Sequence, residues 1–90
     1  MDKFSNMNET EILNLAKSGD NEATSFIIQK YKYISIKLAA EWTNAFIEPE
    51  DLMQEGMIGL LAAIKSYDES KKISFLSYAY TLSLIHISEP

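Results

Sequence analysis

The chain has 90 residues, of which 47% are hydrophobic and 23% charged, and this composition predicts one small folded domain rather than a disordered segment. The formal net charge is −5 and cysteine is absent, which disfavours a protein that binds nucleic acid by itself and excludes a disulfide framework. There is neither a signal-peptide pattern nor an apolar run of about 18 residues, so we expect a cytoplasmic protein without a membrane span.

The first predicted element is a short helix from about Glu9 to Lys17. Residues 1–8 precede it, and because they are polar and aperiodic we expect them to form a flexible tail. Asn8 and Glu11 have the spacing of a capping box, in which each side chain satisfies a backbone N–H of the other residue. This pair predicts where the first helix begins.

Two longer helices are predicted next. Asp20 is a suitable N-cap, and apolar residues recur after it at spacings of three and four as far as Trp42. Pro49 suits the first turn of a third helix. Gly56 and Gly59 lie inside that helix and lower its propensity, so we expect them to be places where another helix comes close.

A last helix is predicted to begin near Ser74 and to turn Phe75, Tyr78 and Ala79 inward. Together these elements predict an all-α fold, a small bundle of three or four helices. We expect large apolar side chains from every helix in the core: Leu15, Phe26, Ile27, Ile34, Leu38, Trp42, Leu52, Leu60, Ile64 and Phe75.

The third helix carries a possible interaction surface. Its residues Asp51, Gln54, Glu55 and Ile58 follow the spacing i, i+3, i+4 and i+7, which places three polar side chains and one apolar one on a single outward stripe. Such a stripe could meet a partner helix, or it could be a solvated face that stabilises the dipole of its own helix. Spacing alone leaves both interpretations open.

The amino-acid sequence of this segment is more informative than its spacing. Residues 51–60 read DLMQEGMIGL, Tyr67 and Asp68 follow, and residues 75–79 read FLSYA. This order of blocks resembles region 2 of the sigma-70 family of bacterial RNA polymerase sigma factors, and the resemblance is continuous over about residues 9–81. The QEG-Met-IGL motif is more similar to that of sporulation and alternative sigma factors of Gram-positive bacteria than to that of primary ones.

The resemblance implies a function in transcription initiation, with core RNA polymerase and promoter DNA as partners and with an anti-sigma factor as a further potential partner. In the family this helix docks on a coiled coil of the largest polymerase subunit, which implies contacts by Asp51, Gln54, Glu55, Ile58 and Leu61. The intact protein would then recognise and melt the −10 promoter element. The implied DNA-binding and melting residues are Tyr78, Tyr80, Lys71 and Lys72, whereas Phe75 is interpreted as a core residue.

Two other classes of function are compatible with a small helical chain. The first is a helical adaptor or anti-sigma-like interaction module without a role at DNA. The second is an enzyme with a carboxylate metal cluster, but Glu48, Glu50, Asp51 and Glu55 lack a histidine partner and a matching second helix. His86 is the only histidine and has no evident partner. We therefore predict no enzyme, catalytic residue, metal or cofactor.

Residues 82–90 read LSLIHISEP and depart from the family pattern. They resemble the translation of a transposon-type sequencing adapter, so the expected domain is residues 9–81, truncated, with a non-native segment after it. If so, Leu84, Ile85 and Ile87 should remain largely exposed or pack opportunistically. Removing the segment should then change the free energy of unfolding by less than about 1 kcal/mol.

Overall fold

Four α-helices and one short 3-10 helix make up the chain in a computed structural model that describes residues 3–43 and 47–88. The α-helices are α1 (Glu9–Lys17), α2 (Asn21–Trp42), α3 (Pro49–Ser66) and α4 (Phe75–Ser88), and the 3-10 helix is η1 (Glu69–Lys71). The predicted all-α fold is confirmed. Within the described ranges, no helix is both long enough and apolar enough to cross a membrane.

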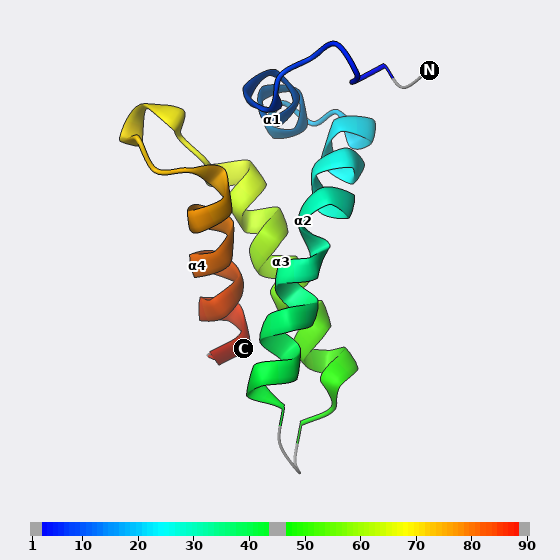
Figure 1. Ribbon diagram of the computed structural model, residues 1–90, viewed down its shortest axis with the longest axis vertical. Coiled ribbons are helices and arrows are strands. Elements are labelled where there is room, and N and C mark those ends of the chain that lie inside the picture. The colour runs from blue at the N-terminus through cyan, green and yellow to red at the C-terminus, as the bar shows by residue number, and fades with distance from the viewer. Residues whose placement is uncertain (1–2, 44–46, 89–90) are drawn as a thin grey trace.

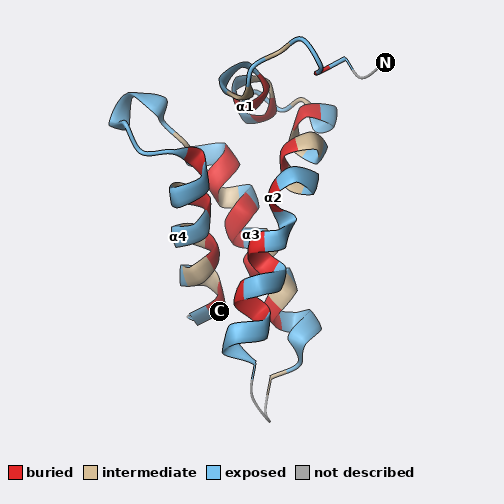
Figure 2. Ribbon diagram, in the orientation of Figure 1, coloured by how far each residue is buried: buried red, intermediate tan, exposed pale blue. Residues whose placement is uncertain are grey.

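The helices form a three-helix bundle with α1 across one end (Figure 1). Helices α2, α3 and α4 alternate in direction, and α3 contacts each of the other three α-helices. The buried faces of α2, α3 and α4 are turned toward one another (Figure 2). The helix that carries the polar stripe is therefore also the helix around which the bundle is built.

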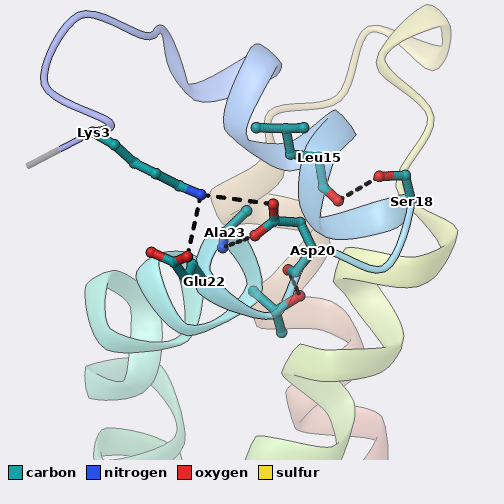
Figure 3. Close-up of polar contacts among 7 residues, drawn as sticks. Lys3, Leu15, Ser18, Asp20, Glu22 and Ala23 are labelled. Carbon is teal, nitrogen blue, oxygen red and sulfur yellow. Dashed lines mark hydrogen bonds and ion pairs between the residues drawn. The ribbon is translucent and has the colours of Figure 1, made fainter.

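The start of each of the first two helices is fixed by a side chain. The Asn8 side chain accepts a hydrogen bond from the Glu11 amide at 2.8 Å, and the Glu11 carboxylate accepts one from the Asn8 amide at 3.1 Å. The Asp20 carboxylate accepts one from the Ala23 amide at 2.9 Å (Figure 3). Both predicted caps are confirmed, because each satisfies a first-turn N–H that the helix itself leaves unpaired.

The segment before α1 is attached to α2 (Figure 3). The Lys3 ammonium lies 3.8 Å from the Asp20 carboxylate and 3.4 Å from that of Glu22. Phe4 is buried, and its ring centroid is 5.1 Å from that of Phe26. The expectation of a flexible tail over residues 1–8 does not hold for Phe4, because the ring finds an aromatic partner on α2. Residues 1 and 2 lie outside the described part of the chain.

The core lies between α2, α3 and α4 and extends to α1. Of the ten predicted core residues, seven are buried: Ile27, Ile34, Leu38, Leu52, Leu60, Ile64 and Phe75. Leu15 and Phe26 are partly buried against them. Trp42 was predicted wrongly, since it is 46% exposed. It shares a face with Leu38 but is the last residue of α2, and α4 ends before that turn (Figure 1).

The two glycines of α3 lie where another helix comes close, as predicted. A Cβ atom at Gly56 would lie 2.7 Å from the Cβ of Ser35 on α2. One at Gly59 would lie 2.6 Å from the carbonyl oxygen of Leu82 and 2.7 Å from the Cα of Ser83, both on α4. The absence of a side chain at Gly59 is therefore what lets the backbone of α4 lie against α3.

The second half of α4 is part of the core. Ser83 is buried and donates a hydrogen bond from its hydroxyl to the Gly56 carbonyl at 3.0 Å. Ile87 is only 3% exposed, whereas Ile85 is 47% exposed. Of the three apolar residues expected to remain largely exposed or to pack opportunistically, Ile85 is exposed, Leu84 is partly buried against the core and Ile87 is buried. Ile87 is buried because α4 continues without a break and turns this side chain toward Gly56.

Candidate functional site

The outward stripe of α3 is a mixed polar and apolar surface. Asp51 and Gln54 are exposed and Glu55 is half-buried. Ile58 and Leu61 are 48% and 37% exposed although both are large apolar residues. The structure therefore brings all five predicted core-polymerase contacts to one side of α3, with the apolar pair one to two turns beyond the carboxylates.

The polar members of this stripe are not bonded to any other side chain or backbone group that the structure describes. In the described part of the chain, no hydrogen bond or ion pair involves the side chain of Asp51, Gln54 or Glu55. With no bond to another described residue, their acceptor atoms are available to charged or polar groups of another molecule. Exposed apolar residues beside such groups are typical of protein interaction surfaces.

A pocket lies at the other end of α3. It has a volume of about 160 Å³ and is lined by Ser66, Tyr67, Asp68, Lys71, Ile73 and Tyr78. The rings of Tyr67 and Tyr78 have centroids 5.8 Å apart, and the Ser66 and Tyr78 hydroxyl oxygens are 2.6 Å apart. Two of the predicted DNA-binding residues, Lys71 and Tyr78, are therefore brought together here.

The turn that borders the pocket is held by hydrogen bonds to its own backbone. The Tyr67 hydroxyl donates to the Ile73 carbonyl at 2.7 Å, which closes the turn. Asp68 accepts from the hydroxyl and the amide of Ser70, and these bonds hold the pKa of its carboxyl below the usual value. Lys72 has a left-handed backbone with a φ of 59°, is exposed, and does not line the pocket.

Tyr80 lines a different groove, between α2 and α4, with a volume of about 480 Å³. Tyr33 and Lys37 of α2 line it too, together with Leu76 of α4. Neither Tyr33 nor Lys37 was predicted from the sequence as a site residue. The available signal was their i, i+4 spacing at positions outside the core stripe of α2. Phe75 is buried, which confirms its interpretation as a core residue.

Acidic side chains gather at the start of α3, where Glu50 and Asp51 occupy the first turn. Within residues 3–43 and 47–88, however, no three or more histidine or acidic side chains are placed so that they could hold a metal ion. The negative charge at this end instead complements the positive end of the helix dipole.

Comparison with known protein families matches residues 27–83 to the family described as Sigma-70 region 2. The matched segment includes all of α3, with its outward stripe, and the pocket that Tyr78 lines. The chain belongs to the sigma-70 region 2 family. The match ends at Ser83, two residues beyond the point where the resemblance was expected to stop.

Named relatives agree with this assignment to sigma-70 region 2. The chain is 30% identical over 78 residues to the RNA polymerase sigma-H factor of Bacillus licheniformis, covering 87% of this chain and 35% of that protein. It is 30% identical over 70 residues to the RNA polymerase sigma-E factor of Clostridium acetobutylicum, covering 78% and 30%. It is 45% identical over 56 residues to the RNA polymerase sigma factor FliA of Pseudomonas aeruginosa, covering 59% and 23%.

The chain thus spans about a third or less of the length of these curated relatives. The sigma-H and sigma-E relatives from Bacillus and Clostridium support the sporulation-type subfamily that the QEG-Met-IGL motif predicts. No solved structure matches the chain at a significant level.

Proposed function

We propose that this chain is the part of a bacterial sigma factor that holds core RNA polymerase and that, in the intact protein, recognises and melts the −10 promoter element. The observation that carries the proposal is the outward stripe of α3, which lies inside the segment matched to sigma-70 region 2 and has no partner in the described part of the chain. Such a protein acts in the cytoplasm, where transcription takes place.

The proposed polymerase contact is a helix-against-helix interface with the coiled coil of the largest subunit. Asp51 and Glu55 would form charge-assisted hydrogen bonds with basic groups of that coiled coil, and Gln54 would add a neutral one. Ile58 and Leu61 would supply an apolar centre from which water is excluded. An anti-sigma factor that blocks initiation would compete for the same exposed residues.

Substituting the polar part of this surface tests the proposal. A chain with Gln54→Ala and Glu55→Lys should lose binding to core RNA polymerase, because one hydrogen bond disappears and a cation replaces a carboxylate. Pull-down by core enzyme measures binding, and circular dichroism measures the fold.

A matched control changes the same residue types on another helix. Gln29→Ala with Glu41→Lys makes the same charge change at two exposed positions of α2, and it should leave the binding intact. Undiminished binding by the Gln54 and Glu55 variant, with an unchanged helical signal, would exclude this face of α3 from the contact.

The proposed DNA contact is the pocket that Tyr78 lines. A base flipped out of a melted duplex could stack on the Tyr78 ring, an interaction worth about 1–3 kcal/mol per base, while Lys71 approached a phosphate. Tyr80 could serve the same strand from the groove between α2 and α4, and Lys72 is exposed in the turn nearby. These roles require unpaired DNA, which the intact protein would generate on the polymerase.

The 90-residue chain should not bind duplex promoter DNA selectively, because its formal net charge is −5 and its eight lysines form no basic helix. Fluorescence anisotropy at low salt, with a promoter duplex and a scrambled duplex of equal length, should give equally weak binding to both. Tight binding that prefers the promoter duplex would show that the chain reads sequence without melting it.

A further inference from the structure

The hydroxyl of Ser66 makes two contacts at the end of α3. Its oxygen lies 2.7 Å from the Ala62 carbonyl oxygen, to which it donates, and 2.6 Å from the hydroxyl oxygen of Tyr78. A serine hydroxyl carries a single proton. Since that proton goes to the Ala62 carbonyl, Ser66 must accept the hydrogen bond from Tyr78, and Tyr78 must be the donor.

This bond fixes the Tyr78 ring from one end, and packing fixes it from the side. The ring of Tyr67 lies 5.8 Å away and is itself perpendicular to Phe75 at 5.3 Å between centroids. Tyr78 is only half-buried, so these neighbours leave part of the ring open to the pocket. Without the bond to Ser66, the ring would be held by packing alone, because the Tyr78 hydroxyl has no other hydrogen-bond partner in the described part of the chain.

We propose that Ser66 is a positioning residue, which holds the Tyr78 ring at the orientation needed for an unpaired base to stack against it. The inference rests on the proposed binding of an unpaired base to this pocket. Ser66 need not touch the DNA for this role. It acts by accepting the hydrogen bond from the Tyr78 hydroxyl, which restrains the Tyr78 side chain before a base binds. The side chain then loses less conformational freedom on binding.

The substitution Ser66→Ala isolates this effect. Ser66 is exposed, and alanine has the higher helix propensity, so the variant should fold as well as the original chain. Ser66→Thr keeps a hydroxyl that can still donate to the Ala62 carbonyl and accept from Tyr78. It is therefore the conservative variant that should rescue binding.

Titration with a short single strand of DNA, followed by NMR through the backbone amide signals around the pocket, can measure weak binding in the 90-residue chain and in each variant. A six-nucleotide strand containing all four bases is the probe. Ser66→Ala should raise the dissociation constant by about 3- to 10-fold, the range that one hydrogen bond supplies, and Ser66→Thr should stay within about 2-fold of the original. The thermal midpoint should change little in either variant, because residue 66 is exposed at the last position of α3.

A double-mutant cycle shows whether Ser66 acts through Tyr78. In a chain that already carries Tyr78→Phe, adding Ser66→Ala should have no further effect, because the donor is gone. An equal loss of affinity in that background would overturn the positioning role, as would unchanged affinity in Ser66→Ala alone.

The underlying base contact is tested separately by Tyr78→Ala. If this variant weakens binding while Ser66→Ala does not, only the positioning inference fails. If Tyr78→Ala binds as well as the original chain, or if the original shows no saturable shift, the proposed base pocket fails and the inference falls with it.

Discussion

A chain that ends at Thr81 should have a free energy of unfolding about 3–5 kcal/mol lower than the 90-residue chain. The truncation removes Ile87, which is buried against Gly56, and the Ser83 hydroxyl that donates to the Gly56 carbonyl. It also removes the partly buried side chains of Leu82 and Leu84. Denaturation by urea, followed by circular dichroism at constant chain concentration, measures the difference.

Two isoleucines of α4 provide a matched control. Ile87→Ala should cost about 2–3 kcal/mol, since it empties a buried site, and Ile85→Ala should cost less than about 0.5 kcal/mol, since that side chain is exposed. The residue type, the helix and the distance from the chain end are nearly the same in both. Equal, small losses would mean that the end of α4 does not support the core.

This expected loss in the free energy of unfolding is larger than the change predicted from the sequence, which was below about 1 kcal/mol. The sequence offered no sign that Ser83 would reach the Gly56 carbonyl, because the two residues are 27 positions apart. That residues 82–90 derive from a foreign reading frame stays a prediction. An independent reading of the gene after Thr81 would test it directly.

Gly59→Ala should destabilise the chain by about 1–3 kcal/mol, although alanine is the better helix former. The new Cβ would lie 2.6 Å from the Leu82 carbonyl oxygen and 2.7 Å from the Ser83 Cα. Both are backbone atoms, so no side-chain rotation relieves the overlap, and α3 and α4 must move apart. Thermal or urea denaturation of the single variant measures the loss.

The same substitution in the chain ending at Thr81 is the control, because Leu82 and Ser83 are then absent. There Gly59→Ala should stabilise the remaining helices by up to about 1 kcal/mol through helix propensity alone. A stabilising effect in both chains would show that α4 does not lie as close to α3 as its backbone contacts indicate.

Local features of the fold could be predicted from the sequence because they depend on neighbouring residues. Each helix cap, at Asn8 and at Asp20, acts within one helical turn. The glycines at positions 56 and 59 act through the absence of a side chain. The contact of Phe4 with Phe26 could not be predicted, since it depends on how the segment before α1 folds back. The exposure of Trp42 depends likewise on where α4 ends.

The candidate site also has a part that could be predicted from the sequence and a part that could not. Helical spacing sufficed to place Asp51, Gln54 and Ile58 on one outward face, which the structure bears out as exposed. The pocket around Tyr78 was only partly foreseen, because Ser66 and Tyr78 meet across a turn whose path is set by the Tyr67 hydroxyl. Hydrogen bonds between residues on different helices leave no periodic signal in a sequence.

One contact of α1 links this helix to the turn that borders the Tyr78 pocket. The Lys17 ammonium donates to the Tyr67 carbonyl at 3.0 Å, across 50 positions of the chain. Fraying of the last turn of α1 therefore breaks a bond at the residue that shapes the pocket. Local unfolding of α1 and rearrangement of Tyr67 are thus thermodynamically linked, and such linkage is reciprocal. A ligand that stabilises Tyr67 in its place would therefore favour the folded last turn of α1. Fraying of that turn would weaken the binding of the ligand by the same factor.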